Sequence, residues 1–176
     1  MSNAIVGMFF LAIMLVAMVT MAGTGFYSMD TITQSWKDME DRTGDTSRTD
    51  ISNLAENSCD GANVTITLKN DGEIPLTDFV EWDVVVQYYA SGSDYIVKYL
   101  AYDSTAPPGD NEWTVEGIYL DASGSTAEVY EPNLFNPGEE MKISIKLNPA
   151  VANGTTNMVT VSTPTGVTAE VMFDGP

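Results

Sequence analysis

Histidine is absent from this sequence, and its absence excludes several classes of enzyme. Serine and cysteine hydrolases use an imidazole as general base, and HExxH zinc sites use two imidazoles as ligands. A GxxxxGK phosphate-binding loop is also missing. The only GxG, residues 23–25, lies in an apolar segment, where close helix packing explains it better than a nucleotide does. We therefore expect neither enzymatic activity nor a cofactor.

Basic side chains are scarce in this chain. Seven Lys and Arg stand against 25 Asp and Glu, which gives a formal net charge of −18. Binding to nucleic acid needs a basic patch, and so does attraction to an anionic membrane surface, so we expect neither. A strongly acidic composition instead favours a domain that faces water and stays soluble.

Cysteine occurs once, at Cys59, so the chain cannot form an intrachain disulfide. An intermolecular disulfide is one interpretation of such a residue. We expect a buried, unreactive thiol instead, because a free cysteine usually packs as a small hydrophobic side chain.

Charge is absent from residues 1–29, and the run AIVGMFFLAIMLVAMVTMAG (4–23) also lacks proline. As a helix this run measures about 30 Å, which is enough to cross a bilayer core. A secretory signal begins with a basic segment, and a simple anchor usually has Lys or Arg at its cytoplasmic edge; neither is present. The many Met, Ala and Gly residues favour a helix that packs against other helices, and a lipid anchor fits the same run.

The apolar character then decreases gradually, and the large apolar side chains are spaced at three to five residues. This spacing is typical of one face of a helix, so we predict a single helix over residues 2–42. Gly44 and the Ser, Thr and Asp residues around it predict the end of the helix, and whether residues 50–57 resume it stays open. The side chains of this face are Tyr27, Ile32, Trp36 and Met39.

From residue 60 onward the apolar residues recur with a period of two, which is typical of half-buried strands. Turn motifs such as Asn70-Asp71-Gly72 and Asn136-Pro137-Gly138 separate the strands. We predict an α+β protein: a long N-terminal hydrophobic helix followed by an immunoglobulin-like antiparallel β-sandwich of seven to eight strands. The expected domains are an assembly helix (1–45), a linker (46–60) and a surface sandwich (61–176). The predicted strands lie at 63–69, 80–89, 94–102, 112–120, 126–130, 140–147, 157–163 and 167–173.

This order of elements resembles the archaellins and related archaeal type IV pilin-like filament subunits. The segments NDGEIPLTDF (70–79), WDVVVQYY (82–89), NPGEEMKISIKL (136–147) and VTVSTPTGVTAEVMF (159–173) are similar to that family's succession of strands and turns. The resemblance implies a basic leader that a prepilin-type peptidase removes, so that the chain from Met1 onward is the mature form. It also implies insertion in the cytoplasmic membrane, then polymerisation on an assembly platform into an extracellular filament for swimming or adhesion.

In such a filament, the helices of many copies pack around the axis and the sandwiches lie outside. We expect this packing to use one face of the helix, formed by Ile5, Phe9, Ala12, Ile13, Val16, Ala17, Thr20, Gly23 and Tyr27.

Two other interpretations remain. A single-pass surface protein, such as an archaellum stator component, has a similar plan, but its helix stays in the lipid. A membrane-tethered hydrolase or sugar-binding module depends only on the acidic and aromatic residues. We expect most of the relevant aromatic residues to lie in the core instead: Trp82, Tyr88, Trp113 and Tyr119.

Two kinds of surface site are also possible from the sequence. Asn63 (NVT) and Asn153 (NGT) are N-glycosylation sequons, and Asn153 has the better-exposed position in a predicted loop. Asp103, Asp110 and Glu112 lie in one loop whose oxygen atoms would suit calcium, although the spacing is not that of an EF-hand. A solvated acidic surface is the competing interpretation of these carboxylates.

Overall fold

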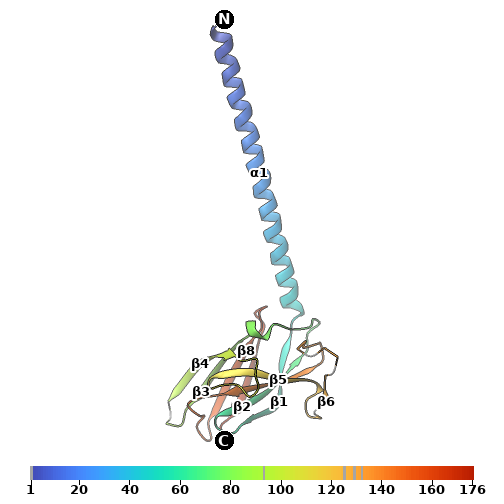
Figure 1. Cartoon of the computed structure of the whole chain (residues 1–176), viewed down its shortest axis with the longest axis vertical. Helices are drawn as coiled ribbons and strands as arrows, with labels where there is room; N and C mark the ends of the chain where they lie inside the picture. Colours follow the sequence, from blue (N-terminus) through green and yellow to red (C-terminus); the bar gives the residue numbers. More distant parts are fainter. Residues whose placement is uncertain (1, 93, 125, 129, 132) are drawn as a thin grey trace. The chain divides into compact units, whose positions relative to one another are not determined.

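The computed structural model describes residues 2–92, 94–124, 126–128, 130–131 and 133–176. The chain divides into two compact units, Met1–Gly44 and Asp45–Pro176. The first unit is helical and the second is a β-sandwich, so the predicted α+β fold class is confirmed (Figure 1).

Helix α1 spans Ser2–Arg48 without interruption. Its hydroxyl groups are satisfied inside the helix: Thr20 Oγ1, for example, donates to the carbonyl oxygen of Val16 at 3.0 Å. Such bonds let an apolar helix carry Ser and Thr without unpaired donors. The predicted end near residue 42 is wrong, because the helix continues through Gly44 to Arg48. A glycine costs only about 1 kcal/mol in a helix interior, which the contacts of the last turn offset.

The sandwich contains nine strands among the described residues, in the spatial order β1-β2-β7-β5-β4-β3-β8-β9 with β6 beside β5. All neighbours are antiparallel except β4 and β5, which pair in parallel through Ala101–Glu112 and Tyr102–Trp113 alone. The first and last strands of this order, β1 and β9, also meet: the side-chain amide of Asn57 on β1 donates to the carbonyl oxygen of Met172 on β9 at 3.2 Å. The bounds are β1 Ile51–Cys59, β2 Asn63–Asn70, η1 (a 3-10 turn) Phe79–Glu81, β3 Asp83–Tyr89, β4 Tyr95–Tyr102, β5 Glu112–Asp121, β6 Thr126–Ala127, β7 Glu140–Lys146, β8 Thr156–Ser162 and β9 Thr168–Asp174.

The hydrophobic core lies between the two layers and consists of the apolar residues that the period of two predicts. Trp82 and Trp113 are the largest fully buried side chains, and the whole apolar face of β3 is buried with them. Tyr88 is also buried, so three of the four aromatic residues expected in the core lie there; Tyr119 is only half-buried. Other fully buried members are Val64, Ile66, Leu68, Met141, Ile143, Ile145, Leu147, Val159, Val161 and Val171.

Strand β1 is the element that the sequence did not predict. Its sequence, ISNLAENSC, has no apolar alternation, and a bulge between Leu54 and Ser58 shifts its register with β2. This segment is therefore a strand because its backbone pairs with β2, and not because its own sequence alternates between apolar and polar residues. The segment expected as a linker, residues 46–60, contains the last residues of α1 and all of β1. The strand expected at 126–130 is only Thr126–Ala127, and residue 129 lies outside the described residues.

Candidate functional site

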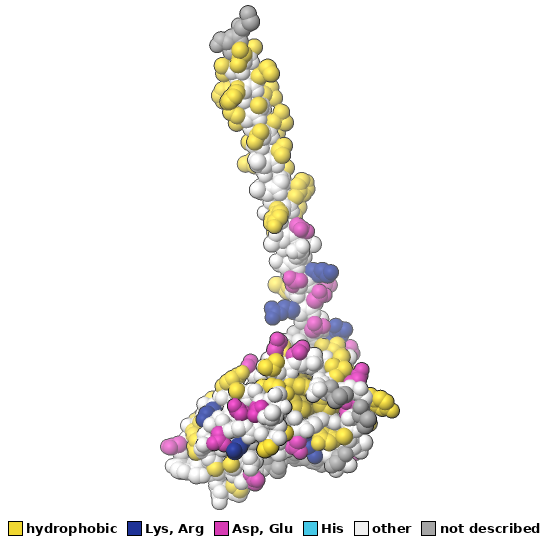
Figure 2. All heavy atoms as spheres, in the orientation of Figure 1, with side chains coloured by type: hydrophobic (Ala, Val, Ile, Leu, Met, Phe, Trp, Pro, Cys, Tyr) yellow, Lys and Arg dark blue, Asp and Glu magenta, His cyan; other side chains and the backbone are white. Residues whose placement is uncertain are grey.

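The apolar half of α1 is the most unusual surface of the chain, because its large side chains are exposed on every side. Phe9 is 71% exposed, Ile13 54% and Val16 64%, and their neighbours around the helix are exposed to a similar extent. Figure 2 shows apolar side chains covering this half, with the charged ones confined to the second half. A helix that is hydrophobic all round needs lipid or other helices to cover it.

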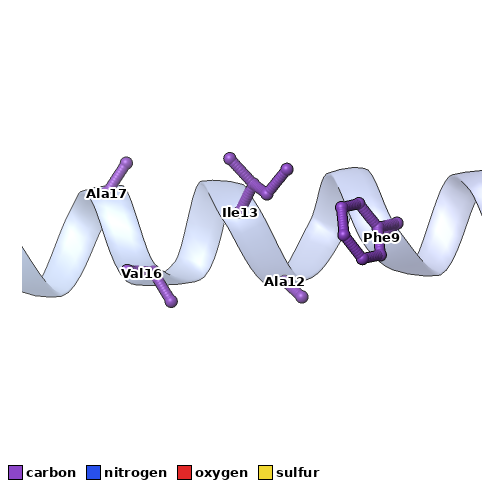
Figure 3. Close-up of a pocket in the computed structure, with 5 residues that line it drawn as sticks. All are labelled: Phe9, Ala12, Ile13, Val16 and Ala17. Carbon is purple, nitrogen blue, oxygen red and sulfur yellow. The ribbon is translucent and has the colours of Figure 1, made fainter.

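The predicted packing face contains an apolar hollow of about 370 Å³. Phe9, Ala12, Ile13, Val16 and Ala17 line it, and Figure 3 shows Ile13 and Ala17 on one side with Ala12 and Val16 on the other. The alanines leave room between the larger side chains, which is the shape that a side chain of another helix fills. The hollow has no polar group to orient a small ligand.

A second apolar hollow of about 250 Å³ lies next to the first along α1. Val16 lines both hollows, together with Leu15, Val19 and Thr20 of the second. The Thr20 hydroxyl bonds within the helix and presents its methyl group to the surface. The other predicted packing residues, Ile5, Gly23 and Tyr27, are also exposed, so all nine are free to contact a partner.

By its length and composition, α1 is the one helix in the described part of the chain that qualifies as a membrane span, and none of its apolar segment is buried in the protein. The first charged side chain is Asp30, and beyond it the helix carries mixed charges. Trp36 is 74% exposed and Met39 68%. The first half of α1 thus suits hydrocarbon, whereas the second half suits an interface with water.

The last turn of α1 is part of the sandwich unit and is held there by backbone bonds. The carbonyl oxygen of Arg48 accepts the Glu73 N–H at 2.8 Å, and Thr46 Oγ1 donates to the carbonyl oxygen of Thr165 at 3.0 Å. Thr49 is buried against the same loops. A Cβ at Gly72 would lie 2.6 Å from the Arg48 oxygen, so only glycine allows this close approach. The sequence indicated a turn at Gly72 but gave no sign that it receives the helix.

The two sequons differ in their surroundings. Asn63 is exposed, but its Nδ2 donates to both carboxylate oxygens of Asp60, at 3.0 and 3.4 Å. Asn153 is exposed in a turn whose next residue, Gly154, has a φ of 67°. A glycan at Asn63 would have to displace the contact with Asp60.

The three carboxylates of the predicted calcium loop are already engaged within the protein, and Asp103 and Glu112 both interact with the Gly109 N–H. Asp103 Oδ1 accepts bonds from the backbone and hydroxyl of Thr105, and these bonds lower the Asp103 pKa. Asp110 pairs with Lys146 at 2.7 Å, which lowers its pKa too, and Glu112 accepts the Gly109 N–H at 3.0 Å. Within the described residues, no three Cys, Asp or Glu side chains gather closely enough to hold a metal ion.

Cys59 is half-buried rather than fully buried as expected. Partial burial raises the pKa of its thiol, which keeps the group protonated and unreactive near neutral pH.

The comparisons with known proteins agree on one group of relatives. Residues 47–173 match the family described as "Conserved flagellar protein F, immunoglobulin-like domain". No curated protein sequence is significantly similar to the chain.

Among solved structures, the archaeal flagellum of Methanospirillum hungatei strain JF1 is similar over 98% of this chain and 91% of its own, with 15% identity and a TM-score of 0.56. This likeness is one of fold and includes the long helix. The archaellum periplasmic stator complex of FlaF and FlaG from Sulfolobus acidocaldarius is similar over 70% of this chain and 87% of its own, with 21% identity and a TM-score of 0.49. Flagellin FlaB1 of Methanocaldococcus jannaschii is similar over 72% and 91%, with 15% identity and a TM-score of 0.49.

The expected relation to archaellum proteins is confirmed by the family match and by the shared fold. Because the match spans most of the chain, this protein belongs to the family of the conserved flagellar protein F, through an immunoglobulin-like domain at residues 47–173.

Proposed function

We propose that this protein is a structural component of the archaellum, with α1 inserted in the cytoplasmic membrane either before assembly or permanently. The observation that carries this proposal is the family match over residues 47–173, joined to a helix long enough to cross a bilayer. The acidic sandwich suits the aqueous side of the membrane. The proposed role is structural, in keeping with the flagellar family match and the likeness to a flagellum structure.

The first candidate role is that of a filament subunit. It is supported by the likeness to the Methanospirillum flagellum, which extends over α1 as well as the sandwich. In this role, the hollow lined by Phe9, Ile13 and Val16 receives side chains of neighbouring α1 helices. Burial of about 20 apolar side chains at about 25 cal/mol per Å² would stabilise each subunit by tens of kcal/mol before entropic losses.

The second candidate role is that of a stator component. It is supported by the name of the matched family, flagellar protein F, because a protein called FlaF forms the archaellum periplasmic stator complex with FlaG in Sulfolobus. In this role, α1 stays in the lipid and the sandwich works in the space outside the membrane. The exposed apolar circumference of α1 fits lipid as well as it fits a helical bundle.

Cell fractionation separates these two roles. Filaments would be sheared from native cells, and the amount of this protein would be compared in filaments and membranes by quantitative mass spectrometry. A filament subunit is a major protein of the sheared filaments and resists mild detergent. A stator component stays with the membranes and dissolves. Recovery of the protein in the cytosol, or normal numbers of archaella after its deletion, would contradict the whole proposal.

The filament role brings further expectations about processing. A prepilin-type peptidase would remove a leader before assembly, and mass spectrometry of the N-terminal peptide would identify the first mature residue. We also propose glycosylation at Asn153, because this amide is exposed and free of the carboxylate contact that Asn63 makes. Asn153→Gln should remove a glycan mass that Asn63→Gln leaves in place.

A further inference from the structure

Strand β4 is an edge strand over most of its length. It pairs with β3 from Tyr95 to Leu100, whereas only its last two residues pair with β5. The bond from the Ala90 N–H to the Asp94 oxygen, 2.9 Å, fixes the alternation in this antiparallel pair. Even-numbered residues of β4 therefore bond to β3. The backbone N–H and C=O groups of Tyr95, Val97 and Tyr99 point to the open side, where no described residue pairs with them.

The side chains of the same three residues form an exposed, uncharged shelf. Tyr95 is 55% exposed, Val97 59% and Tyr99 60%. Their partners on the outer face of β3 are Tyr89, Gln87 and Val85, respectively. The Tyr95 and Tyr89 rings lie 5.2 Å apart, and Tyr95 Oη donates to Gln87 Oε1 at 2.7 Å. We call Tyr95, Val97, Tyr99 and these three partners the β4 shelf.

This edge carries only one of the devices that usually prevent sheets from pairing with other chains. Proteins protect edges with proline, bulges and charged side chains, including ones that point inward. Neither proline nor a bulge occurs in Tyr95–Tyr102, and Lys98 is its single charged residue. Lys98 lies on the face opposite to the shelf and donates from Nζ to the carbonyl oxygen of Asn148 at 3.2 Å, so it leaves the outward backbone groups of β4 uncovered. An open edge beside an uncharged shelf is the arrangement that binds an added strand.

Charge decides between a second copy and another protein as the source of that strand. Residues 45–176 contain 21 acidic and 5 basic residues, a net charge of −16, which opposes the pairing of this edge with the same edge of a second copy. Acidic residues also lie at both ends of the shelf, with Asp94 before Tyr95 and Asp83 at the far end of β3. We propose that the β4 edge binds an extended strand of a different protein, uncharged where it covers the shelf and basic at its ends.

Hydrogen exchange of the full chain tests this proposal in two preparations. The first is the purified protein in detergent micelles at two concentrations, and the second is the isolated cell envelope. The peptide carrying the amides of Tyr95, Val97 and Tyr99 should exchange quickly in micelles at both concentrations. In the envelope, its exchange should slow on the order of tenfold or more, because an added strand protects these amides. Rapid exchange in both preparations would overturn the proposal.

Two variants at one position separate strand addition from general changes at the surface. Val97→Pro removes an outward N–H that plays no part in the β3 ladder, so the fold is kept and the envelope protection of Tyr95 and Tyr99 should be lost. Val97→Thr keeps the amide and should keep the protection. Equal protection in the two variants would contradict strand addition. Protection that already appears in micelles and grows with concentration would assign the edge to a second copy and overturn the choice of partner.

Discussion

Asn70 shows how one buried amide fixes several loops at once. Its Nδ2 donates to the carbonyl oxygens of Ile74 (3.0 Å) and Phe135 (2.8 Å), and its Oδ1 accepts the Gly72 N–H at 3.0 Å. The side chain is fully buried at the end of β2. These bonds hold the loop that receives the last turn of α1, so this residue connects the core to the helix.

We expect Asn70→Ala to lower the free energy of unfolding of residues 45–176 by about 2–4 kcal/mol. The reason is that the Ile74 carbonyl oxygen would lose its donor, while the Phe135 oxygen and the Gly72 N–H would each lose one of two partners, and a buried side chain would leave a void. Urea unfolding followed by circular dichroism measures the change. Asn153→Ala is the control, since this residue is exposed and should change stability by less than about 0.5 kcal/mol. Equal midpoints for the two variants would contradict the assigned role of Asn70.

Asp71 makes the sandwich sensitive to acid. Hydrogen bonds from Ser52 and then Lys69 lower the pKa of its carboxyl group. A group with a lowered pKa in the folded state stabilises the protein above its unfolded pKa, near 4, and this contribution is lost as the pH falls further. The Asp71–Lys69 pair is partly exposed, so solvent screens it and its contribution is small.

Asp71→Asn should therefore lower the melting temperature of residues 45–176 at pH 7 and have a much smaller effect near pH 2. As the pH falls, the wild-type carboxyl takes up a proton and loses this contribution, so the two proteins become more alike. Thermal unfolding at both pH values checks this expectation. A difference that is the same at pH 7 and pH 2 would show that charge at Asp71 is not the cause.

At the scale of elements, α1 is the part of the molecule on which membrane insertion or assembly depends. Val16 lies where the two apolar hollows meet and is 64% exposed. We expect Val16→Asp to prevent stable insertion or filament formation, because a carboxylate at the centre of a membrane helix costs about 2.5–3.5 kcal/mol. Electron microscopy of cells and flotation of membranes measure both outcomes.

Thr43→Asp provides the matched control for this experiment. It adds the same charge to the exposed, polar half of α1 and should leave localisation and filaments unchanged. The sandwich should fold in both variants, because its core shares no side chain with residues 1–44. Intact filaments and normal insertion with Val16→Asp would contradict the assigned role of the hollows.

Within the sandwich unit, the close approach of Arg48 and Asp50 to the loop at residue 72 depends on a single glycine. Gly72→Ala would place a Cβ 2.6 Å from both the Arg48 oxygen and the Asp50 nitrogen, so the backbone must move. We expect a loss of about 1–3 kcal/mol in the full chain in detergent, measured by thermal unfolding. Gly44→Ala is the control: nothing lies within 4 Å of its Cβ, and alanine is the better helix former. A Gly72→Ala protein as stable as the control would contradict this dependence.

At the scale of the whole molecule, the net charge of the sandwich opposes its own folding. Sixteen excess negative charges over residues 45–176 repel one another, and salt screens this repulsion. We expect the melting temperature of this unit to rise at pH 7 when sodium chloride is raised from about 0.05 M to about 0.5 M, where the Debye length is only a few ångströms. An unchanged melting temperature would show that the acidic residues are too widely spaced to matter.

The division of this protein into an apolar helix and a sandwich follows from local sequence patterns. A helix of 20 residues without charge or proline is stable only when lipid or other helices cover it. The composition therefore predicts both α1 and the apolar surface that it exposes in the isolated chain. The period of two in β2, β3, β7 and β9 likewise fixes which side chains enter the core, because successive side chains of a strand point to opposite faces. Both signals are local, and a local signal can be read from neighbouring residues.

Only the tertiary structure decided β1, the end of α1 and the open edge of β4. The residues of β1 have no pattern of their own, and pairing with β2 makes them a strand. The last turn of α1 persists because its carbonyl oxygen reaches Glu73, on a loop 25 residues away in the sequence. The sequence around Tyr95, Val97 and Tyr99 predicts an ordinary strand. No described residue pairs with their outward backbone groups, because only the last two residues of β4 pair with β5. Each of these features depends on which distant segments meet, and no pattern within a single segment records that.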